Sequence, residues 1–179
     1  MSARKFELAV PVNPTDHHLG PSHAPVTLVE YGDFECPNCK QAAPAVKLLL
    51  QRFTGRVRFI YRHFPLEEVH PHALQAALAS EVAAGQGKFW PMHDLLFDNQ
   101  AHLKPPQLRR YAERLELDIV RYDADMADTV YLQRVREDIE GGSRSGVRAT
   151  PTFFVNGMIA DVSAGLQRLF DQVEAALRP

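Results

Sequence analysis

Two cysteines, three positions apart, are the residues best suited to chemistry in this sequence. Cys36 and Cys39 are the two cysteines of the chain, and they occur in the stretch Cys-Pro-Asn-Cys. A disulfide between them would close too small a loop to stabilise a fold, because the entropic gain from a cross-link grows with loop length. The spacing therefore indicates reversible redox chemistry or metal binding.

The segments on either side of the pair predict where it lies. Residues 26–31 read V-T-L-V-E-Y, which is typical of a strand buried on both faces. Apolar residues then recur at helical spacing up to Phe53, and Gly55 follows as a helix end. Pro37 falls in the first turn of this helix, where its missing N–H costs little. The pair is thus expected at the N-terminus of a helix that follows a buried strand.

This position predicts different roles for the two thiols. The N–H groups and the dipole at a helix N-terminus favour an anion, and the thiolate is the form that attacks a disulfide. We therefore expect the pKa of Cys36 to lie below its ordinary value of about 8.5, and Cys36 to be the nucleophile. Cys39, one turn further on, is expected to be more buried and to resolve the mixed disulfide. Between them, Pro37 removes a donor and Asn38 offers a neutral dipole near the sulfur.

Other candidate site residues lie before and after the pair. Glu30 lies on the strand that leads to it; as a buried carboxyl it would have a raised pKa and could exchange a proton with Cys39. The spacing alone fits a solvated strand-edge Glu equally well. Thr150 and Pro151 precede a second apparent strand, and a cis bond there would expose the Thr150 backbone to an extended peptide. Phe34, in the loop before the nucleophile, is a candidate for substrate contact.

The rest of the chain predicts an α/β fold with a mixed central sheet. A strand at 57–61 completes a β-α-β unit, and Asn156-Gly157 predicts a hairpin between two short strands. We expect an extended arm at 1–24 with His17 and His18 in a solvated loop, an α/β domain formed by 25–71 and 146–179, and an inserted helical subdomain at 72–145.

Composition narrows the function classes. The 179 residues, 45% of them hydrophobic, suffice for one well-buried core. A formal net charge of −2 gives no broad basic field for nucleic acid or anionic lipid. No apolar signal core and no run of about 18 apolar residues are visible. The sequence as written predicts a cytoplasmic protein without membrane insertion; a chain whose leader had been removed would look the same and be periplasmic or extracytoplasmic.

Three segments, in order, carry a family resemblance: A-P-V-T-L-V-E-Y-G-D-F-E-C-P-N-C, G-K-F-W-P-M-H-D-L-L-F and G-V-R-A-T-P-T-F-F-V-N-G. Together they resemble the DsbA-like branch of the thioredoxin superfamily. The resemblance implies a thioredoxin fold interrupted by a helical domain, with Cys36 as nucleophile and Cys39 as resolving thiol. Glu30 matches the buried acid of the family and Pro151 its cis proline, while Thr150 matches the preceding residue that tunes redox behaviour.

The resemblance implies no cofactor. The implied partners are protein disulfides or dithiols, or glutathione, together with a redox recycling partner. Strongly oxidising periplasmic members carry Pro-His between the cysteines where this chain has Pro-Asn, so the direction of exchange stays open. In a reducing cytosol, our hypothesis is a reductase.

Three other functions remain open from the residues. Cys36 and Cys39 could form half of a zinc site completed by His63, His70 or His72, although no second C-x-x-C exists. The chain could be a non-catalytic peptide-binding or chaperone module, which would not need both thiols. A glutathione-dependent transferase or isomerase of the same superfamily would usually lack one or both cysteines.

Overall fold

The computed structural model of the chain describes residues 6–179 and confirms the predicted α/β class with a mixed sheet; the first five residues of the predicted arm lie outside this range. The strands are β1 (His17–Leu19), β2 (Val26–Gly32), β3 (Val57–His63), β4 (Thr152–Val155) and β5 (Met158–Ile159). The helices are α1 (Pro37–Arg52), α2 (Ala73–Ala84), α3 (Phe89–Asp98), α4 (Pro105–Arg114), α5 (Ile119–Met126), α6 (Thr129–Arg144) and α7 (Gln167–Ala176).

The five strands form one sheet in the order β1-β3-β2-β4-β5. β1 pairs antiparallel with β3, β2 with β4, and β4 with β5. β2 and β3 are neighbours joined through α1, so the predicted β-α-β unit is confirmed. Six of the seven residues of β2 are buried, as expected from its nearly continuous apolar run.

The hairpin between β4 and β5 is also confirmed. Asn156 and Gly157 have φ angles of 48° and 82°, the left-handed backbone that a two-residue hairpin turn requires and that Asn and Gly tolerate best. The Asn156 side chain accepts a hydrogen bond from the Thr27 N–H at 2.8 Å. This contact ties the turn to the first residues of β2.

The N-terminal arm contains a strand where a solvated loop was expected. His17 and His18 lie in β1, opposite Tyr61 and Ile60 of β3. A strand of three residues is too short to show an apolar alternation, and its pairing is set by a partner more than 40 residues away. Upstream of β1, the buried Asp16 carboxylate accepts two hydrogen bonds, each 2.9 Å long, from the Arg62 guanidinium.

The chain divides into two compact units. Of the described residues, the first unit contains those up to Gly32, then Gln41–Arg62 and Glu140–Pro179; the second contains Asp33–Lys40 and His63–Ile139. The first holds most of the sheet and the second holds α2 to α5. The segment that carries the two cysteines therefore belongs to the helical unit, while the predicted domain limits, 72–145 among them, remain a prediction.

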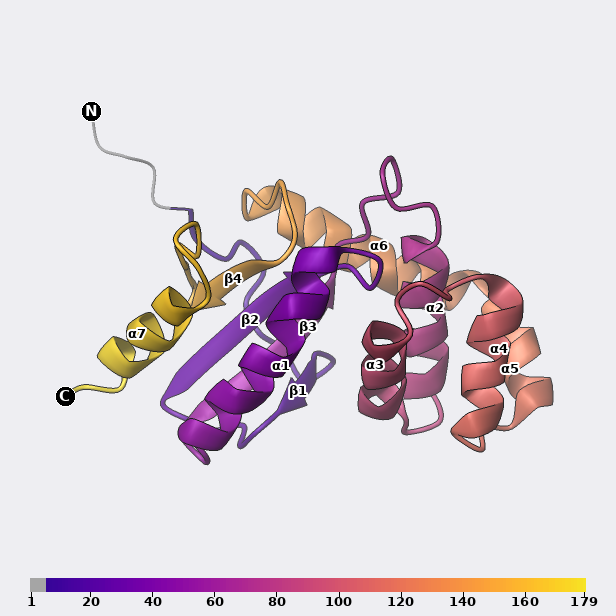
Figure 1. Cartoon of the computed structure of the whole chain (residues 1–179), viewed down its shortest axis with the longest axis horizontal. Coiled ribbons are helices and arrows are strands. Elements are labelled where there is room, and N and C mark those ends of the chain that lie inside the picture. Colours follow the sequence, from indigo (N-terminus) through magenta and orange to yellow (C-terminus); the bar gives the residue numbers. More distant parts are fainter. Residues whose placement is uncertain (1–5) are drawn as a thin grey trace. The chain divides into compact units, whose positions relative to one another are not determined.

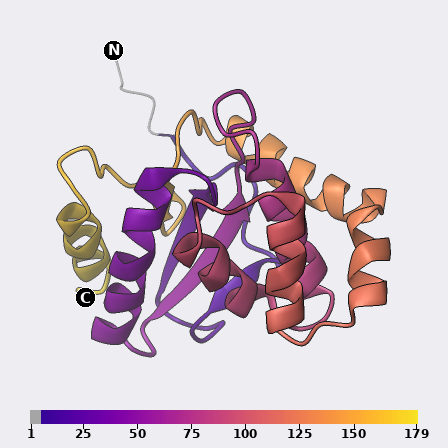
Figure 2. The ribbon, with the colours of Figure 1, turned by 45° about the vertical axis from the view of Figure 1, so that its right-hand side comes forward.

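Along the chain, the helices α2 to α6 lie between β3 and β4 (Figure 1). Both ribbon views show α2, α3, α4 and α5 as one group of helices (Figures 1 and 2). Among the residues of α5, Tyr122 is the one that is buried. Within residues 6–179, no helix is both long and apolar enough to cross a bilayer.

Candidate active site

Cys36 and Cys39 lie at the start of α1, as predicted. The Cys36 N–H donates to the Asp33 carbonyl at 3.1 Å, which closes a tight turn, and the Cys36 carbonyl accepts from the Lys40 N–H at 3.1 Å. The second contact is the first hydrogen bond of the helix, so Cys36 is its N-cap residue. An N-cap side chain faces the N–H groups of the second and third helical residues. This position suits a thiolate, because those N–H groups and the helix dipole stabilise negative charge.

The two thiols differ in access. Cys36 is 5% exposed and Cys39 is completely buried, and both are present as thiols. Pro37 and Asn38 between them are exposed. The predicted greater burial of Cys39 is confirmed, and an incoming disulfide would therefore meet Cys36 before Cys39.

Two acidic side chains that the sequence analysis missed hold the turn before the nucleophile. The buried Asp33 carboxylate accepts from the Glu35 N–H at 2.7 Å, the Leu66 N–H at 2.9 Å and the His70 Nδ1 at 2.7 Å. Since a carboxylate accepts hydrogen bonds, the His70 Nδ1 carries the proton in this contact. The Glu35 carboxylate accepts from the His72 N–H at 2.6 Å. His70 and His72, two of the residues that could have completed a zinc site, thus supply hydrogen-bond donors that fix the turn.

Phe34 is anchored in an aromatic cluster of the helical unit. Its ring centroid lies 6.0 Å from that of His63, 5.6 Å from that of His93 and 5.0 Å from that of Phe97. The side chain is 1% exposed. Its predicted contact with substrate remains a prediction, and it requires the ring to move. His93 and Phe97 are four positions apart in α3, a helical spacing that signals a shared face.

A group of buried ionisable side chains continues from this cluster. The His63 Nε2 lies 2.8 Å from a Glu81 carboxylate oxygen. The Asp138 carboxylate accepts from the His63 N–H at 3.0 Å and from the Arg134 guanidinium at 2.8 Å. Burial raises the pKa of Asp138 above its ordinary value, against the opposing effect of His63 and Arg134. Arg134 and Asp138 lie one helical turn apart, but His63 is 18 positions from Glu81 and 75 from Asp138, so no local signal predicts that these groups meet.

The remaining predicted site residues belong to the unit that holds the sheet. Glu30 is 3% exposed on β2, opposite Phe153 of β4, so its predicted burial is confirmed. The Thr150–Pro151 bond is cis, also as predicted, and it immediately precedes β4. Thr150 is 6% exposed. The roles of Glu30, Thr150 and Pro151 in exchange remain predictions.

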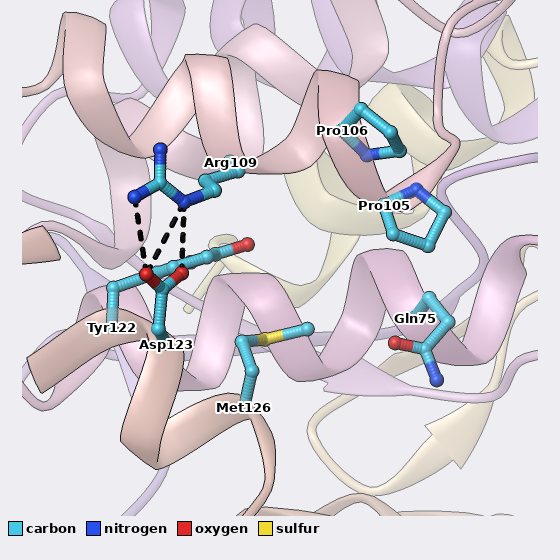
Figure 3. Close-up of a pocket in the computed structure, with 7 residues that line it drawn as sticks. All are labelled: Gln75, Pro105, Pro106, Arg109, Tyr122, Asp123 and Met126. Atoms are coloured by element: carbon cyan, nitrogen blue, oxygen red, sulfur yellow. Dashed lines mark hydrogen bonds and ion pairs between the residues drawn. The ribbon is translucent and has the colours of Figure 1, made fainter. Parts of the chain in front are cut away.

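A separate pocket of about 440 Å³ lies in the helical unit and contains none of the predicted site residues. It is lined by Gln75, Pro105, Pro106, Arg109, Tyr122, Asp123 and Met126. Figure 3 shows the Arg109 guanidinium reaching from α4 to the Asp123 carboxylate on α5, at 2.9 Å. Its Pro, Tyr and Met side chains make the pocket mainly apolar.

Comparison with solved structures gives close matches over most of the chain. BdbD from Bacillus subtilis, in its oxidised form, matches with a TM-score of 0.81 and 25% sequence identity, covering 92% of this chain and 94% of that one. A thioredoxin-like oxidoreductase from Silicibacter pomeroyi matches with a TM-score of 0.81 and 26% identity, covering 92% and 93% of the two chains. The predicted thioredoxin fold is therefore confirmed.

Curated relatives are longer proteins. Na⁺/H⁺ antiporter NhaA 1 of Salinispora arenicola is 51% identical over 172 residues, which are 96% of this chain and 26% of the relative. NhaA 3 of Salinispora tropica is 50% identical over 182 residues, covering 97% of this chain and 28% of the relative. The chain thus spans about a quarter of the length of these relatives. The family model described as thioredoxin matches residues 12–175, and this chain belongs to that family.

Proposed function

We propose that the chain is a thiol–disulfide oxidoreductase that exchanges disulfides with protein or small-thiol substrates. One observation carries the proposal: the reactive pair lies at a helix N-terminus, with Cys36 as the N-cap residue and Cys39 buried one turn further on. The similarity to a thioredoxin-like oxidoreductase supports it.

The proposed reduction of a substrate proceeds in two steps. The Cys36 thiolate attacks one sulfur of the substrate disulfide, a mixed disulfide forms, and the other substrate sulfur leaves as a thiolate. The Cys39 thiol then loses its proton and attacks the Cys36 sulfur, which releases the second substrate thiolate. After the second step, Cys36 and Cys39 are joined by a disulfide, and the substrate has gained two electrons. A recycling partner returns the pair to the dithiol, and oxidation of a substrate runs the same steps in reverse.

We assign the other residues by their chemistry and by the resemblance. The buried carboxyl of Glu30 is proposed to accept the Cys39 proton in the second step. The exposed Pro37 and Asn38 are proposed to face the substrate, and Thr150 and Pro151 to bind its backbone. The proposed direction is reduction in a reducing compartment.

A pair of serine variants tests this function. Purified protein is assayed for reduction of insulin disulfides, with dithiothreitol as electron donor. Cys36→Ser should abolish turnover and form no adduct, because the nucleophile is gone. Cys39→Ser should also abolish turnover. Incubated with an excess of the disulfide substrate and without dithiothreitol, it should accumulate a mixed disulfide through Cys36, visible by mass, because no second thiol is present to resolve it.

The two variants also distinguish the proposed oxidoreductase from a non-catalytic peptide-binding module. A peptide-binding module would show wild-type behaviour in both variants, with no turnover above the dithiothreitol background and no adduct. That result would overturn the proposed function.

A further inference from the structure

The side-chain amide of Gln100 contacts the backbone on both sides of Glu35. Gln100 follows the end of α3, and its Nε2 donates to the Phe34 carbonyl at 2.9 Å and to the Cys36 carbonyl at 2.8 Å. A carboxamide nitrogen has two hydrogens, and these two contacts use both. The side chain is half-buried, so the contacts are partly shielded from competing water.

Other groups also fix the turn at residues 33–36, to which Gln100 is hydrogen-bonded. The Asp33 carbonyl accepts from the Cys36 N–H, and the Asp33 and Glu35 carboxylates anchor the turn to Leu66, His70 and His72. Those anchors act on the residues before the nucleophile. Gln100 differs from them because it binds the carbonyl of Cys36 itself.

The hydrogen bond from Gln100 to the Cys36 carbonyl acts on the thiolate of the same residue. That oxygen already accepts the first hydrogen bond of α1, from the Lys40 N–H at 3.1 Å. A second donor further offsets its partial negative charge, which would otherwise repel a thiolate on the same residue. The two donors also fix the peptide plane, and thereby the angle at which the Cys36 side chain meets the helix N-terminus.

We propose that Gln100 is a positioning residue for the nucleophile, which holds Cys36 at the helix N-terminus in the orientation that favours the thiolate. The inference rests on the proposed function insofar as Cys36 is the reactive thiol. It adds that reactivity depends on a side chain 64 positions away in sequence.

The test compares neighbouring amides. Gln100→Glu places a carboxylate opposite two carbonyl oxygens, and Gln100→Met removes the donors without adding charge. Asn99→Asp is the matched control, because the Asn99 amide donates at 2.8 Å to the Leu95 carbonyl of its own helix. All variants carry Cys39→Ser, so that a single thiol reacts, and circular dichroism and thermal unfolding monitor the fold.

The readout is the rate of Cys36 alkylation by iodoacetamide as a function of pH. Loss of one to two hydrogen bonds should raise the apparent pKa of the thiol by about one unit in both Gln100 variants, and should slow alkylation about tenfold at pH values below the wild-type midpoint. Asn99→Asp should stay within about twofold. If Gln100→Glu does not fold, the alkylation profile of Gln100→Met alone tests the positioning role.

Rates and midpoints of a folded Gln100→Met variant that match those of the control would overturn the positioning role. Alkylation needs no disulfide substrate, so this outcome is distinct from failure of the proposed function. If the wild-type chain does not turn over insulin but the Gln100 variants shift the alkylation profile, the inference stands and the proposed function falls.

Discussion

Arg62 is the residue whose loss should weaken the fold most clearly. Its side chain is 2% exposed, and its guanidinium makes five hydrogen bonds. Two go to the Asp16 carboxylate, and the others go to the Val10 carbonyl, the Pro11 carbonyl and the Tyr31 hydroxyl, at 2.8 to 3.1 Å. A guanidinium has five N–H donors, so each has a partner. Burial alone would lower the pKa of Arg62, but its hydrogen bonds to Asp16 raise it above the ordinary value.

The magnitude for Arg62→Met follows from what the substitution leaves behind. The Asp16 carboxylate, with a side chain 0% exposed, would lose the cation that compensates its burial. Removing one partner of a buried ion pair costs about 3–5 kcal/mol. In a chain of this size each kcal/mol lowers Tm by about 2–4 °C, so a decrease of about 10 °C is expected.

Urea unfolding followed by circular dichroism, and a thermal melt, measure this effect. Arg168→Met is the matched control, because Arg168 forms an ion pair with Asp161 in which the side chains are 55% and 60% exposed. Such an exposed pair contributes little to stability, because solvent screens it. If Arg62→Met destabilises the chain no more than Arg168→Met does, the reasoning about the buried network is refuted.

Three further predictions concern the site and its surroundings. Asp33→Asn should lower the free energy of unfolding by about 1–3 kcal/mol in urea titrations, because the buried carboxylate accepts three hydrogen bonds; an unchanged midpoint would contradict this. Burial raises the pKa of Asp138, so the stability that this group contributes is fully present below its unfolded pKa and is lost as pH rises through the folded value. The stability of Asp138→Asn relative to the wild type should therefore increase from pH 4 to pH 7 in parallel titrations, and a decrease would show the sign to be wrong. Glu30→Gln should slow resolution of the mixed disulfide severalfold in rapid-quench experiments and leave its formation by Cys36 unchanged, whereas equal slowing of both steps would exclude the proposed proton transfer.

Local signals explain what could be predicted from the sequence. The apolar run of β2 and the left-handed turn at Asn156 and Gly157 are encoded by neighbouring residues, so strand and hairpin were both placed correctly. The start of α1 at Pro37 is also encoded by neighbouring residues. Together these features were enough to put the thiol pair at a helix N-terminus.

The missed features depend on contacts between distant residues. Asp33 and Glu35 look like ordinary loop acids, and their partners at 66–72 lie more than 30 positions away. Arg62 lies just after the strand predicted at 57–61. In the structure it belongs to β3, and its ion pair with Asp16 of the N-terminal arm makes it part of the core. No period or motif reports such pairings, because they arise when separate segments pack together.

A measurement of the reduction potential of the Cys36/Cys39 pair shows whether the two thiols form one redox couple. Purified protein is equilibrated in glutathione buffers, trapped with acid and alkylated, and the modified thiols are counted by mass. The proposed function predicts that both thiols disappear together in one two-electron transition, with a midpoint of about −250 mV or below for a reductase and about −150 mV or above for an oxidant. Thiols that remain alkylatable at every glutathione ratio, or that titrate independently without forming the internal disulfide, would contradict it.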